Sequence, residues 1–397
     1  MSEIRTSHVG WVTFCLMILS LPTAICQAAT WKAILVTDKP TRYSRTLAID
    51  SRGKLWASFM KEQGLETWGI GRIDPASSTL IPMSALFAHH VFDLKVTADQ
   101  TVIAATDNGL RMIASDGKIE SEAEGICITM LAAGADGVVL GAGIGGDGAL
   151  HLVRRRKAAQ SLEQWRYPVK GPGKHRDLLR LFERPDGTAV IVTSKEIVLL
   201  KDAKLAPLAL AKTPLATTAE GRSEERRVPP VWLYDATMTS DGSVYCTGFS
   251  KRLVKWWNDR FEIIAEGHFQ ELAPGDVPGT VWATDFNGAL WKWDGGTFAL
   301  AFSLPGGHIQ SLRQTASGSV WLECAPASGP HRLVRISDTP MTSGAETRWA
   351  ETFDAGVPLN LRPGLLSPGI LSLTATPDGC IVIATNAGIW RLQPENH

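Results

Sequence analysis

One pattern, with an average spacing of about 47 residues, recurs eight times and limits the fold more than any other feature of the chain. Each copy has a turn residue, a large apolar residue three places after it and, in most copies, a leucine six places before it. The turn residues are Gly53, Gln100, Gly137, Gly187, Gly242, Gly279, Gly318 and Gly379. Apolar and polar residues alternate before the turn, as a half-buried strand requires, and a second strand rich in Val and Trp follows.

The stretch GTVWATDFNGALWKWD, residues 279–294, contains the second and third strands of one copy. Asn-Gly at Asn108-Gly109 and at Asn287-Gly288 suits the two positive φ angles of a type I′ hairpin, so these strands are predicted to be antiparallel neighbours. A variable fourth strand follows. Four short strands at this period are typical of a β-propeller blade.

Eight copies predict an all-β propeller of eight four-stranded blades. A seven-bladed ring with one misread copy is the alternative, and Ile126–Val153 is the weakest copy. The last copy ends without a fourth strand, so Trp31–Thr37 is predicted to supply that strand and close the ring. Trp56, Trp282 and Trp321 are expected to pack between blades, which would account for many of the 14 tryptophans.

Residues 1–28 are predicted to form a secretory signal peptide. The apolar run Trp11–Leu21 is shorter than the roughly 20 residues that a membrane-spanning helix needs. Residues 29–397 are therefore expected to form a single propeller domain that does not span a membrane and is periplasmic or secreted. Ile25 replaces the small residue that usually precedes a lipidated cysteine, which argues against lipidation at Cys26 without excluding it.

Charge and cysteine content exclude several classes of site. The 40 basic residues are balanced by 40 acidic ones, which argues against nucleic acid as a partner. The cysteines beyond the signal peptide lack C-x-x-C spacing, so neither a disulfide framework nor a zinc site is predicted, although one long-range pair stays open. They are Cys127, Cys246, Cys324 and Cys380. No cofactor or metal is predicted.

Several copies resemble known propeller repeats. IDSRGKLWAS and DGCIVIATNAGIW resemble the two-component-regulator type of propeller repeat, which implies an exported sensing or scaffolding module. Copy six is similar to a WD40 unit, with Gly267-His268 at its start, Trp293-Asp294 at the end of its third strand and Asn287 near the place of the turn aspartate. The likeness to quinoprotein propellers is weaker.

The residues ten places before each turn, or eleven places in copy six, where the repeat slips by one residue, are expected to meet around one mouth of the central channel. The set is rich in ring-bearing side chains, as a ligand-binding mouth would be. The candidate ligand-binding residues are Tyr43, His90, Asp177, Trp232, His268 and His308. A packing role, as in WD40 blades, is the alternative for His268 and His308. Copy two lies across the ring from copies six and seven, so one metal ion shared by their histidines is not expected.

Three inserts interrupt the repeat, at Arg154–Arg176, Thr213–Pro230 and Thr339–Pro368. They are expected between the third strand of one copy and the first strand of the next. The first is strongly basic and is predicted to bind an anionic glycan or an acidic partner, with a solvated loop as the alternative. Its candidate residues are Arg154, Arg155, Arg156, Lys170, Lys174 and Arg176.

These patterns predict a non-catalytic binding, scaffold or sensing module for a ligand or a protein partner in the cell envelope. The alternative is a propeller lyase or hydrolase acting on sugars or lactones. In that case His90, Asp177 or His308 would supply the acid–base groups at the channel mouth.

Overall fold

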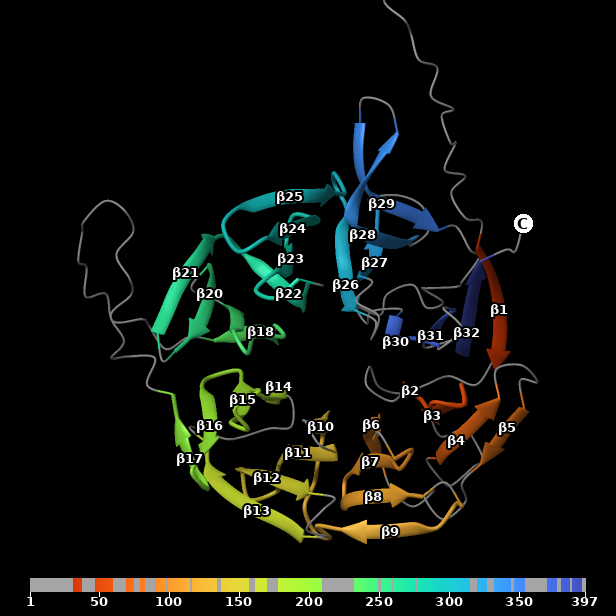
Figure 1. Cartoon of the computed structure of the whole chain (residues 1–397), viewed down its shortest axis with the longest axis vertical. Helices are drawn as coiled ribbons and strands as arrows, with labels where there is room; N and C mark the ends of the chain where they lie inside the picture. The colour runs from red at the N-terminus through yellow and green to blue at the C-terminus, as the bar shows by residue number, and fades with distance from the viewer. Residues whose placement is uncertain are drawn as a thin grey trace, which may run out of the picture.

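The computed structural model describes residues 31–37, 47–59, 69–74, 79–82, 90–97, 99–114, 116–133, 137–156, 161–169, 178–208, 232–248, 251–258, 260–275, 277–314, 320–326, 332–343, 346–353, 370–376, 380–385 and 388–394. Their strands form eight four-stranded antiparallel sheets arranged as blades around a ring (Figure 1). The predicted eight-bladed propeller is therefore confirmed, and Ile126–Val153 contributes a blade of its own.

The blades are numbered in chain order, and the first strand of each is innermost (Figure 1). Blade 1 contains β2 (Leu47–Ile49), β3 (Leu55–Phe59), β4 (Gly69–Asp74) and β5 (Thr79–Pro82). Blade 2 contains β6 (Val91–Val96), β7 (Val102–Thr106), β8 (Gly109–Ile113) and β9 (Ile119–Glu122). Blade 3 contains β10 (Met130–Ala133), β11 (Val138–Ile144), β12 (Ala149–Arg156) and β13 (Ser161–Pro168). Blade 4 contains β14 (Leu178–Glu183), β15 (Ala189–Thr193), β16 (Ile197–Lys201) and β17 (Lys204–Pro207).

Blade 5 contains β18 (Leu233–Met238), β19 (Val244–Gly248), β20 (Arg252–Trp257) and β21 (Arg260–Glu266). Blade 6 contains β22 (Phe269–Pro274), β23 (Val281–Asp285), β24 (Ala289–Trp293) and β25 (Phe298–Ser303). Blade 7 contains β26 (His308–Gln314), β27 (Val320–Ala325), β28 (Arg332–Ser343) and β29 (Glu346–Phe353). Blade 8 contains β30 (Ile370–Ala375), β31 (Ile381–Thr385) and β32 (Gly388–Pro394), together with β1 (Trp31–Thr37).

The ring closes through its two terminal strands, as predicted. Strand β1 pairs antiparallel with β32, from Trp31 opposite Pro394 to Thr37 opposite Ile389. Val36 of β1 is buried in a cluster that also contains Leu47 of blade 1 and Ile389 of blade 8. The first strand of the chain therefore joins the last blade and also packs against the first.

The repeated turn position requires a left-handed backbone. Six turn residues lie in described segments, and all have positive φ angles between 66° and 81°. They are Gly53, Gln100, Gly137, Gly187, Gly242 and Gly279. Glycine adopts this conformation without steric cost, which explains why it recurs there.

The type I′ assignment of the Asn-Gly hairpins is wrong. Gly109 and Gly288 have positive φ angles, but Asn108 and Asn287 do not. In blade 6, one carboxylate oxygen of Asp285 accepts the N–H groups of Asn287 (2.8 Å) and Ala289 (2.9 Å). These bonds hold a turn in which Gly288 has a positive φ angle and Asn287 does not.

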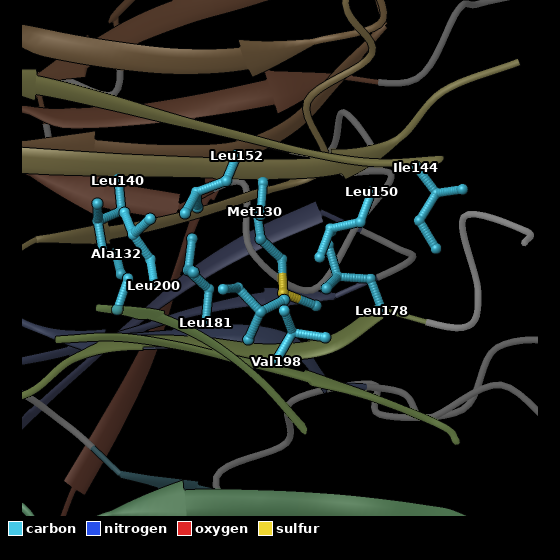
Figure 2. Packing of buried hydrophobic residues seen from close by; sticks show 13 residues of the cluster. Met130, Ala132, Leu140, Ile144, Leu150, Leu152, Leu178, Leu181, Val198 and Leu200 are labelled. Atoms are coloured by element: carbon cyan, nitrogen blue, oxygen red, sulfur yellow. The ribbon is translucent and has the colours of Figure 1, made fainter. Parts of the chain in front are cut away.

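The apolar cores lie between neighbouring blades. Trp56, Trp282 and Trp321 are all buried, as predicted from their position in the repeat. Figure 2 shows the core between blades 3 and 4, where Leu140 and Leu152 face Leu181 and Val198. Each blade is thus buried by its neighbours rather than by its own strands, so the ring is the stable unit.

Carboxylates link the innermost strands of successive blades. An innermost strand presents backbone groups at the channel that have no strand partner. In three places a carboxylate from the preceding blade accepts such an N–H group. The pairs are Asp93 with Leu131 (2.8 Å), Asp235 with Leu272 (2.9 Å) and Glu271 with Leu312 (2.6 Å).

Two of the predicted inserts contain strands. The first includes the end of β12 and all of β13, the third and fourth strands of blade 3. The third includes the end of β28 and all of β29, which pair as a long hairpin (Figure 1). The second insert lies outside the described residues. The first and third are therefore not simple connections between blades.

Candidate functional site

One face of the ring brings together the starts of the innermost strands and the hairpins between second and third strands. In blade 5, Leu233 at the start of β18 pairs with Gly248 at the end of β19. In blade 6, Phe269 pairs in the same way with Asp285. The residues just before an innermost strand therefore share a face with these hairpins, and we call it the strand-start face.

Four of the predicted mouth residues lie on this face. His90 precedes β6, Trp232 precedes β18, His268 precedes β22 and His308 is the first residue of β26. Tyr43 and Asp177 lie outside the described residues. His90 is stacked on Phe92 in blade 2, whereas His308 is in blade 7, with blades 8 and 1 between them. The proposed acid–base groups thus come from separate parts of the ring.

Aromatic side chains gather on the strand-start face of blades 5 and 6. The ring of Phe286, in the β23–β24 hairpin, lies edge-on to Tyr234 (5.9 Å between centroids) and to His268 (6.1 Å). Trp232 lies two residues before Tyr234. Trp232 is 52% exposed and Phe286 is 42% exposed, although both are large and apolar. Such a cluster on a water-facing surface is typical of a recognition site.

A lysine from blade 4 extends the cluster. The ammonium of Lys195, in the β15–β16 hairpin, lies 5.7 Å from the ring centroid of Trp232. This is a cation–π distance. We use the name aromatic patch for Lys195, Trp232, Tyr234, His268 and Phe286. It spans three consecutive blades.

A β-bulge places Tyr234 in the patch. The pairing of β18 with β19 shifts between Leu233 and Asp235, so Tyr234 is the extra residue on the inner strand. A bulge of this kind re-aims a side chain out of the regular alternation. Partial burial raises the pKa of the Tyr234 phenol, which therefore stays a hydrogen-bond donor at neutral pH.

Trp232 and His268 were identified from the repeat frame, but Lys195, Tyr234 and Phe286 were missed. Phe286 carries the only usable sequence signal, because a bulky aromatic residue stands in a hairpin where polar residues are usual. Lys195 has no comparable signal. The position of Tyr234 depends on the bulge, which the repeat pattern does not reveal.

The WD40-like interpretation of copy six needs correction. Asp285, rather than Asn287, supplies the turn carboxylate. Its second oxygen accepts the indole N–H of Trp291 at 3.0 Å, whereas the likeness had singled out Trp293. His268 instead contacts Phe286, and its carbonyl accepts the N–H of Phe286 at 3.2 Å. The histidine therefore belongs to the aromatic patch.

The arginines at the start of the basic insert lie on a strand and face carboxylates. Arg154 is buried, 3.5 Å from a carboxylate oxygen of Glu183, and its guanidinium also donates to the carbonyl of Gly187 at 2.8 Å. Arg155 lies 3.2 Å from Glu122. The solvated-loop interpretation is therefore wrong for these residues.

Arg156 is more exposed and lies 3.8 Å from Glu163. Lys170, Lys174 and Arg176 lie outside the described residues. Anion binding by the insert stays a prediction, but the contacts of Arg154 and Arg155 indicate that these two hold blade 3 against its neighbours.

A carboxylate beside this insert gives a testable pH dependence. Asp147 accepts the N–H of Ala149 at 3.0 Å and lies 2.8 Å from Arg166, and these contacts, with His151, lower its pKa to about 2. A pKa below the unfolded value means that the carboxylate stabilises the fold at neutral pH, and that this contribution disappears as the pH falls from about 4 toward 2.

We therefore expect Asp147→Asn to lower the melting temperature at pH 7, and the difference from wild type to vanish by about pH 2. Thermal unfolding followed by circular dichroism across this range measures it. A difference that stays constant down to pH 2 would contradict the assignment.

Three further features concern the cysteines, the metal-ligating side chains and the helices of the described segments. Among these residues, Cys127, Cys246, Cys324 and Cys380 form no disulfide with one another, and the last three are buried. No group of three or more metal-ligating side chains was found among the described residues. Nor does any helix in those ranges have the length and apolar character to cross a membrane.

Comparisons with known proteins show the fold. No protein-family model matches the sequence, and a search of curated proteins gave no match either. The C-terminal WD40 domain of Sif2 is 11% identical, with a TM-score of 0.59, over 93% of this chain and 100% of that one. Virginiamycin B lyase from Staphylococcus aureus is 10% identical, with a TM-score of 0.50, over 92% and 99% of the two chains.

The extracellular domain of a hybrid two-component system from B. thetaiotaomicron has a TM-score of 0.38 and 11% identity. The match covers 88% of this chain and 56% of that one. At these identities the likenesses show a propeller fold, which is shared by a WD40 domain and by a lyase.

Proposed function

We propose that this chain is an exported, non-catalytic binding module of the cell envelope, and that its ligand or protein partner docks on the aromatic patch. The observation that carries the proposal is the exposure of Trp232 and Phe286 beside Tyr234 and His268. Burying two large aromatic side chains on binding supplies a strong apolar contribution, and Trp and Tyr are the residues that most often dominate binding energy.

The ring supports this role physically. Hairpins and strand starts from three blades hold the patch, so its side chains are positioned before a ligand arrives. A preorganised surface loses less conformational entropy on binding than a flexible loop does. Export, predicted from residues 1–28, would place the patch in the envelope.

The experiment compares two exposed tryptophans. Trp232 is in the patch, whereas Trp257 (38% exposed) lies at the β20–β21 turn, on the opposite face of blade 5. Wild type, Trp232→Ala and Trp257→Ala would be screened by thermal shift against glycans and lactones, and by pull-down against an envelope fraction. A ligand at a hundred times its Kd adds roughly 2.7 kcal/mol of stability, a shift of a few degrees.

We expect a binder that shifts wild type and Trp257→Ala, and that binds Trp232→Ala at least about 30-fold more weakly. The proposal fails if neither screen yields a binder, or if the binder tolerates Trp232→Ala. Turnover of a screened compound by the wild-type chain would also overturn its non-catalytic part.

A further inference from the structure

A lysine occupies a turn position of blade 5 that favours glycine. Lys251, in the β19–β20 hairpin, has a φ of 56°, and its N–H donates to the carbonyl of Gly248 at 3.1 Å. The same turn position is Gly148 (φ 73°) in blade 3 and Gly288 (φ 78°) in blade 6. A residue with a Cβ is strained in this region, because the Cβ crowds the backbone.

Lys251 adjoins the aromatic patch. It is exposed, and its carbonyl accepts the N–H of Gly267 at 2.7 Å, directly before His268. Lys195 of blade 4 lies over Trp232. The patch thus includes one lysine from blade 4, and a second lysine, from blade 5, is bonded through its backbone to the residue before His268.

Three carboxylates near the patch in the described part of the chain have partners. Glu196 accepts the phenol O–H of Tyr167 at 3.2 Å, and Asp285 holds the β23–β24 hairpin. Glu266 is exposed and lies 3.5 Å from Arg252. The side of the patch that faces water therefore combines aromatic rings with lysine ammonium groups.

We infer that the aromatic patch binds an acidic carbohydrate, a sugar chain that carries carboxylates. This inference rests on the proposed function and names its ligand class. An exposed aromatic ring gives a flat apolar surface on which the C–H face of a sugar ring can stack. The Tyr234 hydroxyl and the His268 ring supply hydrogen-bond partners for sugar hydroxyls. The two lysines then pair with the carboxylates.

The geometry favours a sugar over an acidic peptide. The ring of Phe286 stands at 65° to Tyr234 and at 90° to His268, so neither of these rings is stacked flat on Phe286. A peptide that extended the sheet would need free backbone groups, but the N–H of Leu272 at this inner edge is bound by Asp235.

The test is calorimetric titration with trigalacturonate, with neutral galactotriose as the matched sugar and a glutamate hexapeptide as the matched acid. Wild type, Trp232→Ala and Lys251→Gly would be compared at low and high salt. We expect trigalacturonate to bind, with binding weakened by salt, and galactotriose to bind at least about five-fold more weakly.

The Lys251→Gly variant separates a binding role from a structural one. Glycine relieves the left-handed strain, so the melting temperature should equal or exceed that of wild type, while affinity for trigalacturonate falls about five-fold. Lower stability with unchanged affinity would assign Lys251 to the fold and overturn the inference.

The inference is also overturned if galactotriose binds as tightly as trigalacturonate, or if only the peptide binds. If trigalacturonate fails while another ligand or partner still depends on Trp232, the inference fails and the proposed function stands. If no ligand or partner depends on Trp232, both fail.

Discussion

Replacing Asp235 with alanine should destabilise the ring by about 3 kcal/mol, a large part of the stability of most domains. The Asp235 side chain is almost completely buried on the innermost strand of blade 5. One carboxylate oxygen accepts the N–H of Leu272 in blade 6, and the other lies 2.7 Å from the guanidinium of Arg180 in blade 4. A single side chain therefore joins three consecutive blades.

The size of the effect follows from what alanine would leave behind. The Arg180 guanidinium would lose its carboxylate partner, and the N–H of Leu272 would be buried without an acceptor. Removing one member of a buried ion pair costs about 3–5 kcal/mol, and we take the lower value because the Arg180 side chain keeps 31% of its surface exposed.

Asp235→Asn should be milder, because the amide oxygen can still accept from Leu272. Burial also raises the pKa of Asp235, which indicates that the fold tolerates an uncharged group at this position. Urea unfolding measures the free energy of unfolding of wild type, Asp235→Ala and Asp235→Asn. Glu120→Ala, which breaks the exposed pair of Glu120 with Lys118, is the control and should unfold like wild type. Equal stability of Asp235→Ala and wild type would show that the link is dispensable.

The architecture was predictable because it depends on local sequence. The turn residue needs a positive φ, and the large apolar residue three places later fills the space between blades, so both features recur from blade to blade. Trp282, for example, is completely buried. The hairpin type was mispredicted because Asn-Gly suits more than one turn. In blade 6 the turn type is set by Asp285, whose carboxylate accepts the N–H groups of Asn287 and Ala289.

The candidate site was only partly predictable. The repeat places Trp232 and His268 on the strand-start face, because they stand ten and eleven residues before the turn residues of their copies. It does not show that Tyr234 is a bulge residue or that Phe286 is exposed. An aromatic residue in a repeat protein is usually core, and only the packing of three blades shows which rings reach water. The partners of Arg154 likewise come from another blade, because Glu183 ends β14 and Gly187 lies in the turn that follows it.

Gly248→Ala should weaken both the fold and ligand binding, although residue 248 carries no side chain to contact a ligand. A Cβ at Gly248 would lie 2.2 Å from the carbonyl oxygen of Trp232, a contact that backbone atoms cannot accept. The chain entering blade 5 would have to move away, and Trp232 and Tyr234 would move with it. We expect a stability loss of about 1–3 kcal/mol from this overpacking.

Blade 3 provides a matched control. Gly143 occupies the same place in the repeat, where a Cβ would lie 1.8 Å from the carbonyl oxygen of Cys127. Gly143→Ala should therefore cost comparable stability, but it displaces no residue of the aromatic patch. Urea unfolding gives the stability of each variant, and titration with a Trp232-dependent ligand, well below the unfolding midpoint, gives its affinity.

The two variants should separate by affinity. Gly248→Ala is expected to bind the ligand at least about ten-fold more weakly than wild type. A backbone shift of about 1 Å takes the Trp232 ring out of its contact with the ligand. Gly143→Ala should bind like wild type. Equal losses would mean that the ring transmits strain between blades 3 and 5. Unchanged binding in Gly248→Ala would mean that the start of β18 does not position the ligand.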